Sequence, residues 1–203
     1  MKQFDGYKAE KATQRENLPA GGYVARILAA KVEQTQNGSE YLLISFDITE
    51  GDKANFFRRD YAAQNESYGE KRWRGTYKLW VPDDGRSNYE WSLRAFNNAM
   101  YCIEDSNAGY RWDWHEESLK GKSIGVVYRE KEWEMPDRTT GEIRTGWTTE
   151  CGALCTVQEA RDGSFYALKP KPLSGDRRTA TQANSGAGAQ AFVEVDDDEL
   201  PFR

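Results

Sequence analysis

The chain has 203 residues, of which 38% are hydrophobic, 30% charged and 13% aromatic, proportions typical of one ordinary domain with or without an appendage. A chain of this size buries roughly 70% of the surface that its unfolded form exposes, so its fold requires no disulfide or metal. The 28 Lys and Arg against 33 Asp and Glu give a net charge of −5, which taken alone argues against a nucleic-acid-binding protein. However, residues 193–203 hold five acids and one base, so −4 of this charge belongs to the last eleven residues.

Several other classes of function are excluded by what the sequence lacks. No apolar run approaches the ~20 residues of a membrane span, and residues 1–17 lack the apolar stretch of a signal peptide, so we expect a cytoplasmic protein with no membrane partner. Three cysteines without a Cys-x-x-Cys pair and a single histidine, His115, cannot build a His-based zinc site. The chain also contains no G-x-S-x-G, H-E-x-x-H or G-x-G-x-x-G motif. We therefore expect no metal, no cofactor and no enzymatic activity.

Strand signals start at Gly22, where the segments YVARILAAKVEQTQ and EYLLISFDITE lie on either side of Asn37-Gly38. An Asn-Gly pair between two apolar runs is the strongest short-range signal for a β-hairpin, because both turn residues take a positive φ. Residues of the second strand alternate in polarity, which predicts that Tyr41 lies on the outer face. Four apolar residues of this strand are expected to face the core: Leu42, Ile44, Phe46 and Ile48.

The middle of the chain predicts a further strand and one amphipathic helix. A strand start is expected at Phe56, and a clearer strand at 76–81. Ser87-x-x-Glu90 matches a capping box, and the apolar residues after it recur at helical spacing as far as Ile103.

The remainder of the domain returns to strand signals. After a short helical turn at 113–119, strands are expected at 123–133 and 143–160, followed by a last short strand at 164–170. The order strand-strand-strand-helix-strand-strand describes an all-β domain with one helix.

The densest mixture of basic and aromatic residues lies between Phe56 and Trp80, where six bases meet three acids and seven aromatics. Single-stranded nucleic acid needs cations along its phosphates and flat rings for its unpaired bases, each stack contributing ~1–3 kcal/mol. If Lys78 points outward, Trp80 lies beside it, and Trp73 has no apolar sequence neighbour to share a core with. Aromatics more often fill cores, so part of this set is expected to be structural. The candidate contacts with single-stranded nucleic acid are Tyr41, Arg58, Arg59, Lys71, Arg72, Trp73, Arg74, Lys78, Trp80 and, near the loop between the last two strands, Arg129 and Trp133.

The end of the chain combines a polar linker with an acidic tip. Residues 174–191 contain no Val, Ile, Leu, Met or aromatic residue, so they cannot offset an ordering entropy of ~1–2 kcal/mol per residue and are expected to be disordered. In the tip, Pro201 limits the conformations lost on docking, Phe202 offers an aromatic anchor, and the acids steer the segment toward a basic pocket on a partner. The candidate partner-binding residues are Asp196, Asp197, Asp198, Glu199, Leu200, Pro201 and Phe202.

This tip, together with the strand order between Gly22 and about Val157, resembles the bacterial and phage single-stranded DNA-binding proteins. The resemblance implies a five-stranded OB-fold barrel within residues 1–173 and a disordered linker with a partner-binding tip at 174–203. It also implies a protein that coats unpaired DNA without sequence preference in a bacterial host cell and recruits replication, recombination and repair proteins through the tip. Unlike the family's tips, this one continues to Arg203, which moves the terminal carboxylate one residue beyond the Phe.

Other functions stay open at this stage. An OB-fold protein-protein adaptor without nucleic-acid binding would line a peptide groove with the same aromatics, and a cold-shock-like protein would bind RNA with the same chemistry. A metal-dependent nuclease that uses the tail acids is disfavoured, because a disordered run cannot preorganise two metals. The sequence leaves open a homo-oligomer, the number of nucleotides covered, and the named partner.

Overall fold

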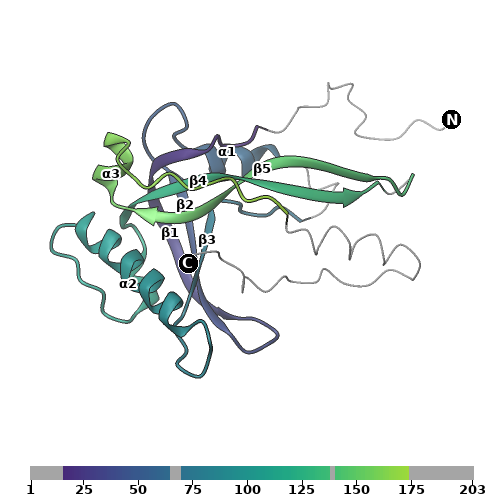
Figure 1. The fold of residues 1–203 in the computed structure, drawn as a ribbon. Coiled ribbons are helices and arrows are strands. Elements are labelled where there is room, and N and C mark those ends of the chain that lie inside the picture. The colour runs from purple at the N-terminus through teal and green to yellow at the C-terminus, as the bar shows by residue number, and fades with distance from the viewer. Residues whose placement is uncertain (1–15, 65–69, 138–139, 174–203) are drawn as a thin grey trace.

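Residues 16–64, 70–137 and 140–173 are described by a computed structural model of the chain (Figure 1). Five strands make up most of the regular secondary structure of these residues. The expected linker and tip lie outside the described residues. In chain order the elements are β1 Gly21–Gln34, β2 Glu40–Ile48, α1 Phe56–Ala63, β3 Thr76–Trp80, α2 Tyr89–Asp105, a 3-10 helix at Glu116–Leu119, β4 Ser123–Pro136, β5 Ile143–Cys155 and α3 Val157–Asp162.

The five strands form one antiparallel sheet in the order β3-β2-β1-β4-β5. β1 occupies the centre because it is long enough to pair with β2 along most of its length and with β4 over its first six residues. β3 and β5 are the two edges of the sheet, and no pairing joins them among the described residues. α2 contacts both edges (Figure 1). The expected five-stranded antiparallel sheet is therefore confirmed, whereas the sheet does not close into a barrel.

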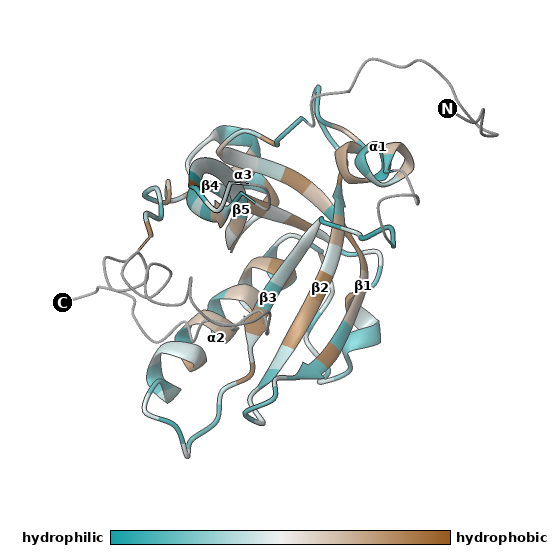
Figure 2. Cartoon of the chain, turned by 90° about the vertical axis from the view of Figure 1, so that its right-hand side faces the viewer, coloured by the Kyte–Doolittle hydropathy of each residue, from teal (hydrophilic) through white to brown (hydrophobic). Residues whose placement is uncertain are grey.

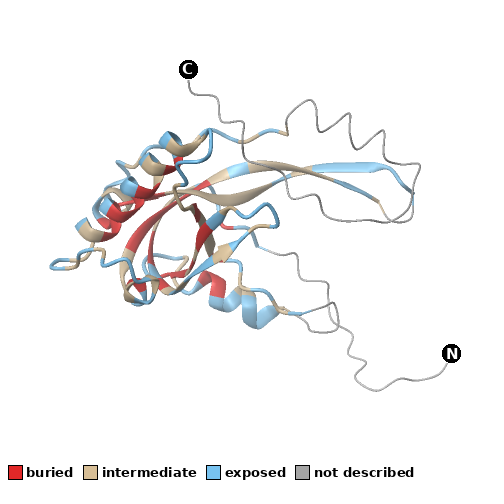
Figure 3. Ribbon diagram, turned by 90° about the horizontal axis from the view of Figure 1, so that it is seen from below, coloured by how far each residue is buried: buried red, intermediate tan, exposed pale blue. Residues whose placement is uncertain are grey.

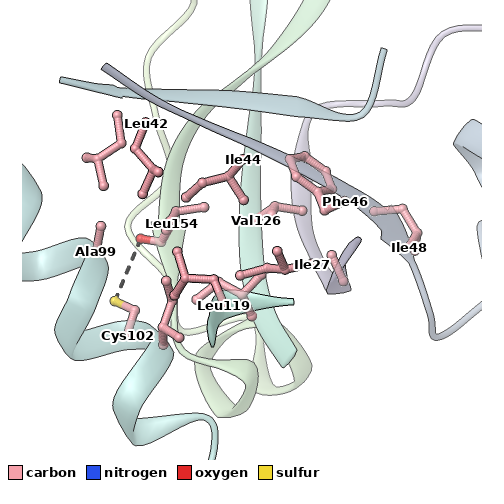
Figure 4. Close-up of a cluster of buried hydrophobic side chains, with 14 of the residues drawn as sticks. Ile27, Leu42, Ile44, Phe46, Ile48, Ala99, Cys102, Leu119, Val126 and Leu154 are labelled. Atoms are coloured by element: carbon pink, nitrogen blue, oxygen red, sulfur yellow. Dashed lines mark hydrogen bonds between the residues drawn. The ribbon is translucent and has the colours of Figure 1, made fainter. Parts of the chain in front are cut away.

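The hairpin of β1 and β2 provides the core face of the sheet. All four core residues expected on β2 are at most 2% exposed, so the predicted core face is confirmed, although Tyr41 and Asp47 on the opposite face are buried as well. They pack against residues of β1, β4 and α2 and against Leu119 of the 3-10 helix (Figure 4), and apolar bands follow the strands in Figure 2. The Asn-Gly turn differs in one detail from the expectation. Gly38 has a φ of 77° but Asn37 is not in the positive region, and the Gly38 N–H donates to the Thr35 carbonyl oxygen (3.0 Å).

The strand start expected at Phe56 is wrong, because helix α1 begins there. The chain enters the helix through Asn55, whose φ of 58° is left-handed and whose side chain makes no cap bond. The buried carboxylate of Asp47 on β2 replaces that cap by accepting the N–H groups of Phe57 (3.0 Å) and Arg58 (3.3 Å). The two phenylalanine rings at the start of α1 are buried, and Phe57 meets Phe46 edge-on at 5.8 Å.

Helix α2 confirms the expected amphipathic helix, but the capping box at Ser87 is wrong. The helix starts at Tyr89 with Asn88 as its N-cap, and Asn88 makes no side-chain cap bond. The inner side of α2 is buried and its outer side is exposed, as Figure 3 shows.

A true capping box lies instead at Thr156 and Glu159, where the sequence predicted strand. It starts α3, so β5 stops at Cys155, and Gly163 with a φ of 72° ends the helix. The strand expected at 164–170 is also wrong, since the following segment pairs with β4 by a single parallel bridge at Lys171. The described residues contain three α-helices, and the expectation of a single helix is therefore wrong.

β4 and β5 continue beyond the sheet as a two-stranded arm. β4 pairs with β1 as far as Tyr128, while its pairing with β5 continues to Pro136 and Ile143. The arm projects away from the body of the domain in Figure 1, and its far end is exposed in Figure 3.

Replacing Asp47 with Ala should lower the free energy of unfolding by about 1–3 kcal/mol, because two N–H donors at the start of α1 lose their acceptor in a buried site. Urea unfolding followed by circular dichroism measures the change. Asp52→Ala removes an exposed carboxylate next to the same helix and should change stability by less than about 0.5 kcal/mol. Equal losses in the two variants would contradict the capping role.

Candidate nucleic-acid interface

Three of the expected contact residues meet on the outer face of β2 and β3. The strand register places Tyr41 opposite Trp80 and Leu43 opposite Lys78. The Tyr41 and Trp80 rings lie edge to face with centroids 5.6 Å apart, and the Lys78 Nζ lies 4.2 Å from the Tyr41 centroid and 5.5 Å from that of Trp80. We call these three residues the β2–β3 cluster. The cluster joins a cation to aromatic faces on one sheet surface.

Within the cluster, Tyr41 is on the outer face as expected but is largely covered, with 9% of its surface exposed. Its hydroxyl donates a hydrogen bond to the Glu33 Oε2 (2.7 Å). Hydrogen bonds from Lys31 and then Tyr41 hold the pKa of the Glu33 carboxyl below its usual value, so the acceptor stays ionised at neutral pH. Tyr41 therefore supports Lys78 and Trp80, and Trp80 is the partly exposed ring of the cluster.

The basic residues between positions 58 and 74 gather around α1. Arg58 and Arg59 are exposed on the helix, and the Arg59 Nη1 donates to the Ala54 carbonyl oxygen (2.9 Å). The Arg74 Nη1 pairs with the Asp60 Oδ1 at 3.2 Å, and the Lys71 Nζ lies 5.7 Å from the Tyr61 ring centroid. The exposed Arg72 is held by its backbone N–H, which donates to the Gln64 side chain (2.8 Å).

β3 connects this basic group to the β2–β3 cluster. Arg74 lies two residues before the first residue of β3, and Trp80 is its last residue. At ~3.3 Å per residue the strand from Thr76 to Trp80 spans ~13 Å. The two groups therefore mark the two ends of one strand.

Trp73 does not have the exposed position that the sequence predicted. Its indole Nε1 donates to the carbonyl oxygens of Phe46 (3.0 Å) and Gly75 (3.1 Å). Its ring packs against the core and lies 5.9 Å from the Tyr61 ring. The interpretation that it lacks apolar neighbours is wrong, because those neighbours come from β2 and α1 rather than from adjacent residues. Trp73 holds the segment before β3 in place.

Arg129 and Trp133 lie on β4, at the base and along the length of the arm, and not with the cluster. The Arg129 Nη2 pairs with the Glu150 Oε1 at 2.9 Å, and the Lys131 Nζ pairs with the Glu150 Oε2 at 2.8 Å. Burial acts to raise the pKa of Glu150, but Lys131 and Arg129, together with the charge of Lys171, outweigh it and hold that pKa below its usual value. The Trp133 ring lies over Gly146, where an added Cβ would be 2.7 Å from a ring atom. This close packing explains why position 146 is a glycine, since a larger residue would clash with the Trp133 ring.

Two residues that the sequence analysis did not select lie next to Trp80. Arg86 and Trp91 line a cleft together with Trp80, between the start of β2, the end of β3 and the first turn of α2. One sequence signal pointed to Trp91, since it lies on a predicted helix but outside the helical series of apolar residues.

The described residues hold no group of three or more His, Cys, Asp or Glu side chains that could bind a metal ion. Burial raises the pKa of the Cys102 thiol to about 11 and that of Cys155 to about 12, so both stay protonated at neutral pH. In the described part of the chain, no helix has the length and apolar character needed to span a membrane.

The residues of the expected tip, 196–202, lie outside the described residues. No family model matches the chain, and a search of curated proteins found no match.

Replacing Glu150 with Gln should lower the free energy of unfolding at pH 7 by about 1 kcal/mol, because a partly exposed pair with two cations is lost. The folded-state pKa is lowered, so this contribution is present above pH 4.5 and disappears as the pH falls through the lowered pKa. Urea unfolding at pH 7 and pH 3 measures the difference between wild type and variant at each pH. Glu142→Gln, an exposed position on the arm, is the control. A wild-type advantage that is the same at pH 3 would contradict the assignment.

Proposed function

We propose that this protein binds single-stranded DNA on the outer face of β2 and β3, in an open barrel of the OB type. The observation that carries the proposal is the β2–β3 cluster, in which Lys78 lies over Tyr41 next to the partly exposed Trp80. OB-folds bind oligonucleotides on the corresponding strands and on the loops that follow the first and fourth strands. The strand order β3-β2-β1-β4-β5, with a helix between β3 and β4, supports that architecture.

The chemistry of the cluster suits unpaired nucleotides. A base can stack on the Trp80 ring, which contributes ~1–3 kcal/mol, while the Lys78 ammonium neutralises a neighbouring phosphate. Stacking is tolerant of sequence because every base has a π-face. The proposed binding therefore has no strong sequence preference.

The charge distribution supports local rather than global attraction of DNA. Two of the basic residues that the sequence predicted as DNA contacts already face acids, Arg74 facing Asp60 next to α1 and Arg129 facing Glu150 on the arm. Lys78 lies against the rings of Tyr41 and Trp80. At the other end of β3, Arg58 is exposed on α1. A strand that follows β3 would pass from one basic group to the other.

The acidic tip supports the second half of the proposal, the recruitment of replication, recombination and repair proteins in a bacterial cytoplasm. Four consecutive acids followed by Leu-Pro-Phe provide charge steering and an apolar anchor in one short segment. This part rests on the sequence and on its resemblance to the single-stranded DNA-binding proteins.

A protein-protein adaptor is the alternative, and one observation favours it. Trp114 is 78% exposed, has a left-handed φ of 65° and stacks parallel to Phe96 beside a second cleft. That cleft is lined by three carboxylates, which suit a basic protein segment and repel phosphates. DNA binding by the full chain decides between the two functions.

The full chain should bind a fluorescently labelled single-stranded oligothymidylate, with log K falling against log salt at a slope near −3 if about four phosphates are neutralised. Trp80→Ala should lose ~1–3 kcal/mol of binding, and Lys78→Ala should reduce the slope by about 0.7. Fluorescence anisotropy at several salt concentrations gives both quantities. Tyr166→Ala, an exposed aromatic after α3, should bind like wild type. A wild type that does not bind, or a salt response that is flat, would contradict the proposal and favour the adaptor.

Deleting residues 196–203 should leave DNA affinity unchanged or raise it, because a tethered anion competes with phosphate for the same cations. The deletion and Phe202→Ala should both lose the capture of DNA-processing proteins from bacterial lysate, although Phe202→Ala keeps every acid. Anisotropy measures the affinity, and mass spectrometry identifies the captured proteins. Weaker DNA binding after the deletion would contradict this role of the tip.

A further inference from the structure

The cleft next to Trp80 is built from two segments of the chain. Ser39 and Glu40 lie just before and at the start of β2, and the second segment runs from Trp80, the last residue of β3, through the connecting loop to Trp91 in the first turn of α2. Its volume is about 180 Å³. Drug-sized ligands occupy pockets of ~300–1,000 Å³, so this cleft suits a single ring system.

The residues that frame the cleft include two indoles. Trp91 is 38% exposed although it lies on α2, whose buried side packs against the core. Trp91 is not among the buried residues of α2, so packing in the core does not explain why a residue as large as tryptophan stands at this position. Trp80 belongs to the β2–β3 cluster as well, and the cleft therefore continues the surface on which the proposed strand lies.

The charges of the cleft distinguish a base from a phosphate. Arg86 is the basic residue of the lining, and its guanidinium is held by the Asp83 Oδ2 (3.0 Å to Nε) and by the Asn37 carbonyl oxygen (3.0 Å to Nη2). Glu40 and Asp83 also line the cleft, so the formal charge of the lining is −1. A phosphate would meet net repulsion, whereas a neutral base brings no charge and can donate its amino or ring N–H groups to the carboxylates.

We propose that the cleft between Trp80 and Trp91 binds one unpaired base of the strand that lies on the β2–β3 face. The proposal rests on the proposed function, and it adds α2 to the DNA-binding surface. Trp91 provides the stacking ring, the carboxylates accept hydrogen bonds from the edge of the base, and the phosphates stay outside near Lys78.

Trp91→Ala should weaken the binding of a single-stranded oligonucleotide about 5- to 150-fold, the range that the loss of one base stack produces. The factor should be the same at every salt concentration, because the cleft holds no phosphate. Arg86→Gln should likewise leave the salt slope unchanged. Tyr101→Ala is the matched control, since it removes an aromatic ring that is 61% exposed on the same helix but does not line the cleft. Thermal unfolding checks that each variant folds.

A second measurement does not depend on the stability of the variant. In wild type labelled with 5-fluorotryptophan, saturating oligonucleotide should shift the fluorine resonance of Trp91, which is assigned with Trp91→Phe. A resonance that stays in place overturns the proposal.

The outcomes separate the two proposals. Normal binding by Trp91→Ala together with weakened binding by Trp80→Ala overturns the base site and leaves the proposed function intact. A salt slope reduced by about 0.7 in Arg86→Gln assigns a phosphate to the cleft and overturns the base assignment. If the wild-type protein does not bind the oligonucleotide, the proposed function is contradicted, and the base site that rests on it is contradicted as well.

Discussion

The alternation of β2 is the constraint on which the rest of the structure depends. One face of the strand is buried in the core through four apolar residues, and a register slip by one residue would turn that whole set to the outside. Because the core fixes β2 so strongly, the outer residues are fixed as well. The same constraint brings Tyr41 opposite Trp80 and sets Lys78 over both rings. The candidate interface is thus positioned by the hydrophobic effect acting on the other side of the sheet.

Asp47 extends that constraint from the sheet to α1. It is the polar residue of β2 that is buried, and its carboxylate holds the first amides of the helix. The arginines on α1 and the segment leading into β3 depend on this anchor for their place. Trp73 makes a second connection between this segment and the sheet, because its indole N–H donates a hydrogen bond to the Phe46 carbonyl oxygen on β2. A basic surface is in this way fixed to the sheet by the buried Asp47 and the partly buried Trp73.

The aromatic residues divide into supports and exposed rings, and the division follows their hydrogen bonds and packing. Trp73 is held by two carbonyl oxygens, and Trp133 covers a glycine of the neighbouring strand. Trp80 and Trp91, by contrast, line an open cleft. Tyr41 lies between the two groups, because it is on the outer face but is covered and bonded to Glu33. Residue type alone does not distinguish these roles.

The sequence by itself determined the elements whose signals are local. The hairpin, the core face of β2, the strand at β3 and the amphipathic α2 all follow from periodicity and turn residues, which depend on neighbours a few positions away. It also placed Lys78 and Trp80 on one face, because strand geometry has a period of two. Only the tertiary structure decided that Phe56 starts a helix, since its cap comes from Asp47 on another element. The same holds for the burial of Trp73, the pairing of Arg129 with Glu150, and the cleft that joins Trp80 to Trp91. Each of these depends on contacts between different secondary-structure elements, which the periodicity within one segment does not encode.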